Sequence, residues 1–422
     1  MSSNLKVNTI LPSTGTAIGI GTDSGNVDIL GHIVGHNTPN ISGINSVTAS
    51  HFYGDGSQLS GIDASSIKFG GSTKAQANAA GVVVTGICTA TSFSGDGSNL
   101  TGLSTPFRNL IINGAMQVAQ RGTSSTSSGF YTVDRFQLNF TGTNEAPTQA
   151  QAALTSSDTP YSLGFRSAYK VTNGNQTGGG GAAKFIRFKT TIEAQDIAQS
   201  GWNYTSSSSN VTLSFWVKAS VAQTYYGRLQ TEDGTARNYP FSFALSENTW
   251  TKVTKTISGN TSPTLQFDDN NGAGLILEIV PYYGTNYTGS MSLDTWATYS
   301  DRTPDNTANW YETNDATFEI TGVQLEVGSQ ATPFEHRSFT DEELRCQRYF
   351  WKYSGTIYGG AYGGNGFCNY SLPTRMRIKG ALSYTGLRTS SSFYDYSSAQ
   401  LLQIQMGATN PYISNPQLDS EL

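Results

Sequence analysis

The chain has 422 residues, a net charge of −5 and only 13% charged residues, with 46 glycines. The charged share is about half of the roughly 25% usual for soluble domains, and glycine exceeds its usual share of about 7%. No basic tract or Lys/Arg run is present, which argues against nucleic acid or an anionic membrane as partner. A composition of this kind is typical of β-rich proteins with uncharged surfaces.

The first 105 residues contain a repeat. Val47–Ile62 (VTASHFYGDGSQLSGI) returns 41 residues later, measured from Phe52 to Phe93, as Cys88–Leu103 (CTATSFSGDGSNLTGL). Each copy predicts two short strands joined by an Asp-Gly turn. Two copies are too few for a self-sufficient solenoid, so either other chains supply the missing partners or the copies lie as separate beads. We favour a slender shaft shared by several chains.

Targeting signals and cysteine usage limit where the chain works. Its first residues, MSSNLKVNTILPSTG, lack the basic and apolar regions of a secretory signal peptide. No apolar run approaches the roughly 18–20 residues of a membrane span. The three cysteines lie far apart and form no disulfide framework, which suits a reducing cytoplasm. We expect synthesis in the cytoplasm, no membrane insertion, and release by lysis.

Residues 106–339 are dense in aromatic residues and in strand patterns. Val211–Lys218 alternates strictly, with Val211, Leu213, Phe215 and Val217 on one face. Nine segments are predicted to be strands: Phe107–Asn113, Asp134–Phe140, Ala183–Lys189, Val211–Lys218, Tyr225–Gln230, Trp250–Ile257, Gly274–Pro281, Ser290–Tyr299 and Ala316–Val327. Strands at this spacing predict an all-β, antiparallel two-sheet sandwich, with only a short helical turn at Ile192–Gln199.

One longer helix is predicted near 341–351, where the third region, 340–422, begins. Thr340 would be its N-cap with Glu343 completing a capping box, and Phe339 and Leu344 would form a hydrophobic staple. The helix would connect the sandwich to a small β-rich C-terminal tip that is rich in glycine and tyrosine.

Four stretches of this chain resemble the tail-fibre proteins of tailed bacteriophages, above all those of marine cyanophages. They are the GDGSxLTG repeats, RNLIINGAMQVAQRGTS at Arg108–Ser124 with YTVDRF after it, the strands VTLSFWVKAS and TWTKVTKTI, and ITGVQLEVGSQATPFEHRSFTDEELRCQRYFWK at Ile320–Lys352. The two strands are similar to core strands of a carbohydrate-binding-module jelly roll. The resemblance implies a virion location in the tail, a jelly-roll domain and a homo-oligomer, most often a trimer, that contacts other virion tail proteins. It names no receptor.

Metal sites and catalytic motifs are weak in this sequence. His32 and His36 are four residues apart, but their glycine-rich segment (LGHIVGHN) is not helical in pattern, so this spacing does not place them on one helix face. Asp268–Gly272 (DDNNG) is an oxygen-rich turn, and modules of the resembled kind often hold structural calcium, but a plain polar turn is the favoured interpretation. The sequence therefore predicts no catalytic residue, no resident metal and no cofactor, with structural calcium as the one open option.

Glycan binding is the favoured chemistry, because sugar rings stack on aromatic side chains while their hydroxyls need polar partners. Trp250 is expected in the core, whereas Trp216 fits the core and an open face equally well. Candidate contacts are Trp202, Tyr282, Tyr283, Tyr287, Trp310 and Tyr311 in predicted loops of the sandwich, and Tyr358, Tyr362, Phe367 and Tyr370 in the tip. For each of them, packing inside the sandwich is the competing interpretation.

The sequence thus favours a non-enzymatic tail-fibre subunit in which residues 1–105 attach to the virion and the sandwich and tip bind a host surface polysaccharide. A structural adaptor or head or neck decoration fibre, carrying another protein, is the first alternative. A polysaccharide depolymerase is the second, and would need two carboxylates about 5–9.5 Å apart across the sugar bond.

Overall fold

The structure is a computed structural model that describes residues 66–69, 72–78, 81–89, 108–299, 302–304, 307–362, 365–388, 393–407 and 410–422. The chain divides into two compact units, Met1–Phe93 and Ser94–Leu422. The first copy of the repeat, and all but the start of the second, lie outside the described residues. The predicted three-part division at 105 and 339 stays a prediction.

In the first unit, three strands form one antiparallel sheet: β1 (Ser66–Phe69), β2 (Ser72–Asn78) and β3 (Gly81–Val84). Val82, Val83, Val84 and Ile87 are all exposed, although their side chains are apolar. A sheet of this size with exposed apolar side chains has little to stabilise it alone.

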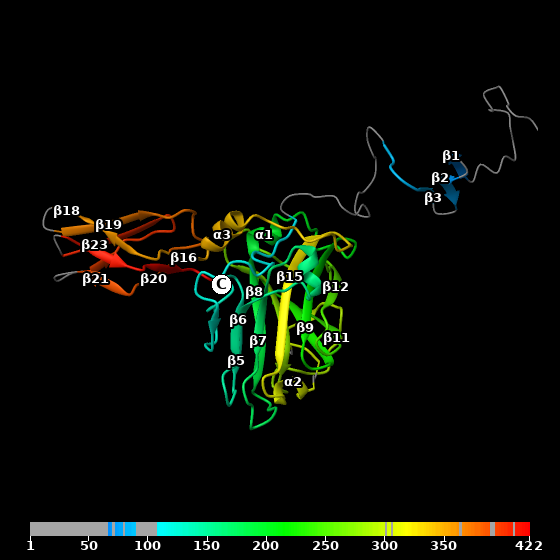
Figure 1. Cartoon of the computed structure of the whole chain (residues 1–422), viewed down its shortest axis with the longest axis horizontal. Coiled ribbons are helices and arrows are strands. Elements are labelled where there is room, and N and C mark those ends of the chain that lie inside the picture. Colours follow the sequence, from blue (N-terminus) through cyan, green and yellow to red (C-terminus); the bar gives the residue numbers. More distant parts are fainter. Residues whose placement is uncertain are drawn as a thin grey trace, which may run out of the picture. The chain divides into compact units, whose positions relative to one another are not determined.

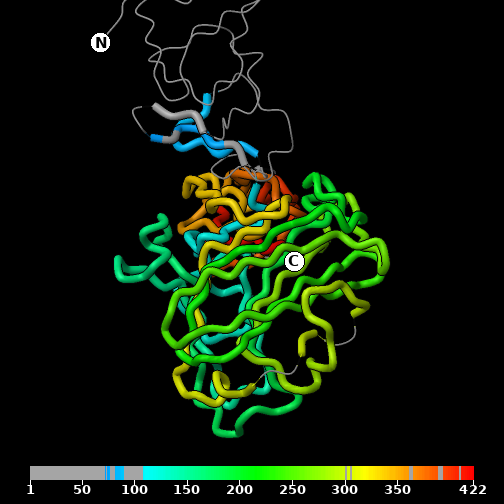
Figure 2. Tube along the Cα trace, turned by 90° about the vertical axis from the view of Figure 1, so that its right-hand side faces the viewer, coloured from blue at the N-terminus to red at the C-terminus, as the bar shows by residue number. Residues whose placement is uncertain are grey.

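The second unit contains a sandwich of two six-stranded antiparallel sheets, which confirms the predicted all-β jelly-roll class (Figure 1). We call the first the β9 sheet, in the order β12 (Thr251–Ser258), β9 (Asn210–Ala219), β15 (Thr317–Val327), β7 (Ser167–Thr172), β6 (Thr148–Ala153) and β4 (Ser124–Ser125). We call the second the β13 sheet, in the order β14 (Ala297–Thr298), β11 (Arg237–Leu245), β10 (Gln223–Thr231), β13 (Ala273–Tyr283), β8 (Phe185–Glu193) and β5 (Gln137–Thr141). The long green strands run side by side in Figure 2.

Alternating side chains build the core between the two sheets. On β9, Val211, Leu213, Phe215 and Val217 face inward and are fully buried, as the sequence predicted. Because side chains alternate along a strand, Ser214 and Trp216 must then face outward. The inward residues of β13 and β15 close the same core from the other sheet and from the neighbouring strand.

Three short helices stand between the strands: η2 (Thr159–Leu163), α1 (Ala194–Ala198), which confirms the predicted helical turn, and α2 (Asn309–Glu312). In Figure 1, α2 lies at one end of the sandwich and α1 near the other. The described part of the predicted strand Phe107–Asn113 is not a strand. It lies against β15, where the Asn109 amide donates to the Val323 carbonyl at 3.0 Å and the Leu110 N–H to the Leu325 carbonyl at 2.9 Å.

The connecting helix is α3 (Phe339–Gln347), so the predicted span of 341–351 begins too late and ends too late. Its N-cap is Ser338, whose hydroxyl accepts from the Asp341 N–H at 3.1 Å, rather than the predicted Thr340. Phe339 and Leu344 are exposed, so they bury no staple. The helix ends early because the chain turns into β16 (Phe350–Lys352).

We expect Ser338→Ala to lower the free energy of unfolding by about 1 kcal/mol, because the Asp341 N–H loses its cap. Thr340→Ala, at the position where the sequence places the cap, should change it by no more than about 0.5 kcal/mol. Urea unfolding of both variants measures the difference. A larger loss in Thr340→Ala than in Ser338→Ala would contradict this assignment of the cap.

The C-terminal module is three small antiparallel sheets. Their orders are β16-β25-β20, β17-β24-β21 and β18-β19-β23-β22. The remaining strands are β17 (Thr356–Tyr358), β18 (Gly360–Tyr362), β19 (Asn365–Ser371), β20 (Ala381–Ser383), β21 (Gly386–Arg388), β22 (Phe393–Asp395), β23 (Leu401–Met406), β24 (Tyr412–Ser414) and β25 (Gln417–Asp419). A separate core around Trp351, Ile404 and Leu418 holds them together.

Charged side chains join this module to the sandwich. Arg348 binds the buried Glu193 of β8 with two nitrogen–oxygen contacts of 2.7 Å, and Tyr349 donates to the same carboxylate at 2.6 Å. Glu421 pairs with the buried Arg135. None of the helices in the described part of the chain has the length and apolarity needed to span a membrane.

Candidate functional site

An apolar groove lies on the outer face of the β9 sheet, and we call it the Trp216 groove. Its floor is Ser214 and Trp216 of β9, Lys252 of β12 and Gly322 of β15. One wall carries Leu163 and Phe165, and the other is the segment Ala331–Phe334 with His336. Its volume is about 480 Å³, within the range of small-ligand sites.

Strand register brings the floor together. Trp216 is paired with Lys252 on β12 and with Thr321 on β15, so its ring has a cationic neighbour on one side. A bulge after Thr321 places Gly322 at φ 64°, in the left-handed region. A Cβ at Gly322 would lie 2.7 Å from the Phe165 ring, so glycine is what lets this ring approach the floor.

Aromatic contacts fix the walls. Phe165 packs edge-on against Phe334 with ring centroids 4.9 Å apart, and His336 lies 5.0 Å from both rings. The His336 Nε2 lies 2.9 Å from the Leu163 carbonyl oxygen, which ties the two walls together. The two walls are therefore fixed relative to each other by contacts of their own side chains and backbone, which favours preorganised binding.

Trp216 itself is half-buried, with its ring part of the groove surface. The indole N–H groups of Trp202, Trp250 and Trp310 all donate to protein oxygens. Among the described residues, the indole N–H of Trp216 has no such acceptor. The Trp216 side chain thus offers a ligand both a ring surface for stacking and a hydrogen-bond donor.

The electrostatics of the groove are mildly cationic. Lys252 is exposed and has no carboxylate partner in the described part of the chain. Nearby, Lys218 is occupied by Asp158 at 3.3 Å and Glu319 at 3.4 Å. Burial raises the pKa of Asp158, but hydrogen bonds from Thr155 and the Trp250 indole outweigh it and lower that pKa to about 2. Among the residues that the structure describes, no Asp or Glu lines the groove itself.

Five predicted glycan contacts are corrected, because the structure buries their side chains: Trp202, Tyr282, Tyr283, Trp310 and Tyr311. Trp310 is the second residue of α2 and points into the core, where its Nε1 donates to the Thr317 carbonyl at 3.0 Å. Tyr311 packs against Tyr282 in the same core, with ring centroids 4.4 Å apart and the ring planes tilted by 32°. Asn309 and the polar residues around it predicted a loop, but the short helix turns its aromatic residues inward.

The other five candidates are not brought into one site. Tyr287 is half-buried beside the β13 sheet, 5.1 Å from the Phe185 ring. In the C-terminal module, Tyr358 is 77% exposed, while Phe367 and Tyr370 are half-buried and Tyr370 packs on Trp351. Tyr362 is in β18, and its side chain lies outside the described residues. Whether these residues touch a glycan stays a prediction.

Trp216 is the aromatic residue that the sequence left undecided. The alternation of β9 contained the deciding signal, since four inward aliphatic and aromatic residues require Trp216 to face outward. The sequence could not show that Phe165 and Phe334, far apart along the chain, would form walls around it. Trp250 is buried, as predicted.

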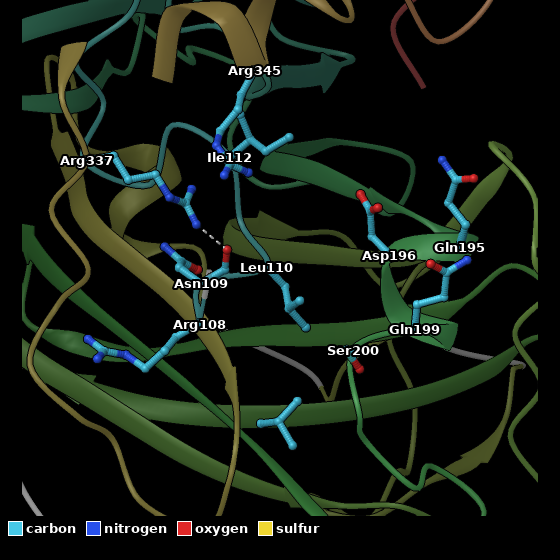
Figure 3. Close-up of a pocket in the computed structure, with 11 residues that line it drawn as sticks. Arg108, Asn109, Leu110, Ile112, Gln195, Asp196, Gln199, Ser200, Arg337 and Arg345 are labelled. Carbon is cyan, nitrogen blue, oxygen red and sulfur yellow. Dashed lines mark hydrogen bonds between the residues drawn. The ribbon is translucent and has the colours of Figure 1, made fainter. Parts of the chain in front are cut away.

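A second pocket, of about 470 Å³, is more polar (Figure 3). Its lining combines the segment after Arg108 with α1 and with Arg337 and Arg345. Arg337 donates to the Asn109 carbonyl oxygen at 2.6 Å and pairs with Glu335 and Glu342. Arg337 therefore holds the segment that lies on β15.

The turn proposed for calcium uses its side chains within the protein. Asp269 accepts from Gln199 at 2.6 Å, and Asn270 accepts from the Gly272 N–H at 2.7 Å. Within the described residues, no three or more His, Cys, Asp or Glu side chains converge as a metal site. Calcium at Asp268–Gly272 stays untested.

No protein-family model matches the sequence, and no curated protein matches it either. Among solved structures, the chain is similar to a family 11 carbohydrate-binding module from Clostridium thermocellum, with 9% identity, a TM-score of 0.24, and coverage of 51% of this chain and 98% of the other. It is also similar to the N-terminal cellulose-binding domain of Cellulomonas fimi β-1,4-glucanase C, with 13% identity, a TM-score of 0.22, and coverage of 51% and 99%. Similarity at this level does not reach function, so the ligand has to be inferred from this chain's own residues.

Proposed function

We propose that this chain is a non-catalytic subunit of a phage tail fibre, whose sandwich binds a host cell-surface glycan in the Trp216 groove. The observation that carries the proposal is the half-buried Trp216 ring, lying in a preformed groove with an unoccupied indole donor. Sugar rings present apolar CH faces that stack on such a ring. Ser214 and Lys252 line the same groove and supply hydrogen bonds for hydroxyl groups, whereas the Thr332 hydroxyl already donates to Glu326 at 2.6 Å and can only accept.

The virion role comes from the resemblance of the repeats and connecting segments to tail-fibre proteins. The exposed valines of β3 support a shaft in which several copies of the chain, a trimer in the resembled family, cover each other's apolar side chains. Copy number would then multiply a weak single-site affinity, because tethered sites rebind at high effective concentration. The exposed Tyr358 of the C-terminal module is available as a further contact.

Depolymerase activity has less support at this groove. Glycoside hydrolysis needs two carboxyl groups flanking the sugar bond, and none of the described residues that line the groove carries one. Elsewhere in the sandwich, Glu278 and Glu326 are buried and already bonded to protein donors. The described lining of the groove therefore fits sugar binding better than glycoside hydrolysis.

An array of bacterial surface polysaccharides tests the proposal with purified, full-length protein. We expect the wild type to bind at least one glycan, and Trp216→Ala to weaken that binding about tenfold or more, because a central aromatic anchor is lost. Tyr131→Ala, which removes an exposed aromatic side chain elsewhere on the sandwich, is the matched control and should bind as the wild type does.

Three outcomes would overturn the proposal. They are no binding to any glycan by a folded wild-type sample, unchanged binding by Trp216→Ala, and release of reducing sugar from a bound polysaccharide. The thermal midpoint of each variant, measured in parallel, shows that any lost binding is not lost folding.

A further inference from the structure

We infer that the outer face of the β13 sheet is a second binding site, which holds the carboxylate or sulfate groups of an acidic polysaccharide. Four cationic side chains gather there around one carboxylate: Arg187, Lys189, Arg228 and Arg302 around Glu278. This site shares no residue with the Trp216 groove, which lies on the other sheet.

Strand register places the charges in one row. Gln137 on β5 pairs with Lys189 on β8, Lys189 with Glu278 on β13, and Glu278 with Arg228 on β10. All four side chains face away from the core, because the next or preceding residue on each strand faces into it: Leu138, Phe188, Leu277 and Leu229. The row therefore crosses the sheet on its outer face.

Protein donors already satisfy the carboxylate of Glu278. Arg187 donates to Oε1 at 2.6 Å, and both Arg228 and the Tyr283 hydroxyl donate to Oε2 at 2.6 Å. Glu278 and Arg228 are almost completely buried, so this pair belongs to the fold. The single negative charge of Glu278 is thus shared between two arginines, and the other two cations add positive charge to this face.

Lys189 and Arg302 remain without an acid of their own in the described part of the chain. Arg302 donates to the Tyr283 hydroxyl at 3.3 Å and lies 5.0 Å from the Tyr287 ring. Lys189 is half-buried and makes no ion pair with a described residue. Burial lowers the pKa of Lys189, and Arg187 lowers it further, while Glu278 and the exposed Glu232 raise it. A bound anion would offset the free-energy cost of keeping the half-buried Lys189 positively charged.

Neighbouring side chains indicate that the anion is part of a sugar chain. Asn139 and Gln137 lie beside Arg187 and Lys189 on β5 and present amide groups on the same face. Phe185 and Tyr287 add half-buried rings next to the cations. Amides, rings and unpaired cations together match the hydroxyls, CH faces and acidic groups of a uronate or sulfated sugar.

Binding of the full-length protein to three polymers tests this inference: polygalacturonate, dextran sulfate and uncharged dextran. We expect the wild type to bind one or both charged polymers more tightly than dextran, and which one binds shows whether carboxylate or sulfate is preferred. Lys189→Gln should weaken that binding about tenfold or more, because a charge-assisted hydrogen bond is lost, and Lys189→Arg should restore most of it.

Lys170→Gln is the matched control, since Lys170 is a half-buried lysine on β7 in the other sheet. Failure of both charged polymers to bind would overturn the inference, as would equal binding by Lys189→Gln and the wild type. Competition by duplex DNA as strong as that of the charged sugar would also overturn it, in favour of non-specific polyanion binding. The Trp216→Ala variant leaves the outer face of the β13 sheet unchanged. Its binding to the charged polymers therefore tests this second site independently of the Trp216 groove.

Discussion

Glu278→Gln should lower the free energy of unfolding by about 3–5 kcal/mol, measured by urea denaturation at neutral pH. The substitution leaves Arg228 and Arg187 in a nearly dry part of the sheet without a counter-charge. Breaking one side of a buried ion pair costs this much, because the remaining charge stays desolvated. Glu247→Gln, at an exposed acid of the same sandwich, should stay within about 0.5 kcal/mol of the wild type.

The same carboxylate gives the protein a pH dependence. Burial raises the pKa of Glu278, but Arg228, Arg187 and the Tyr283 hydrogen bond outweigh it and lower that pKa to about 2. The folded-state pKa lies below the unfolded one, which is near 4.5. The contribution of the ionised Glu278 to the free energy of unfolding is therefore fully present above pH of about 4.5, and it is lost as the pH falls toward 2. The gap between wild type and Glu278→Gln should therefore narrow over that interval, and a constant gap would contradict the ion pair.

Trp310→Ala should also cost about 3–5 kcal/mol, because it empties a large space in the core. The Trp310 side chain is fully buried, lies 6.4 Å from Phe318 between ring centroids, and its indole hydrogen bond to Thr317 would be lost as well. The midpoint of urea unfolding measures the loss. Tyr358→Ala removes an exposed ring and should leave the midpoint nearly unchanged.

This pair of variants separates the two interpretations that the sequence left open for each aromatic residue. If Trp310 were a glycan contact at the surface, its replacement would weaken binding and leave stability near that of the wild type. An unfolding midpoint unchanged in Trp310→Ala would contradict the core assignment.

The fold was largely predictable where alternation and burial agree. On β9, four inward residues in strict alternation predicted the strand, its inner face and its place in a sandwich. The strand β6 could not be predicted from its sequence TQAQAA. Its Gln149 is polar but buried, where it is bonded to Thr132, Tyr169 and Ser127. A polar side chain with its own buried partners breaks the pattern that periodicity depends on.

The prediction of a strand at Phe107–Asn113 failed for the opposite reason. Its apolar residues fit a strand, yet the Asn109 side chain takes the place of ladder hydrogen bonds by contacting the Val323 carbonyl and the Leu325 N–H. The candidate site was hidden in the same way. Its floor follows from one strand, but its walls come from contacts between segments distant in sequence, which no local pattern specifies.

NMR of the six tryptophan indole N–H groups, with a polysaccharide identified on the array, tests the central claim most directly. Trp202, Trp250, Trp296 and Trp310 donate to protein oxygens, and Trp351 is buried in the C-terminal core, so their signals should hardly move. We predict that the Trp216 signal, assigned with Trp216→Phe, shifts in a saturable way. A Trp216 signal that stays in place while the glycan binds would contradict the Trp216 groove as the binding site.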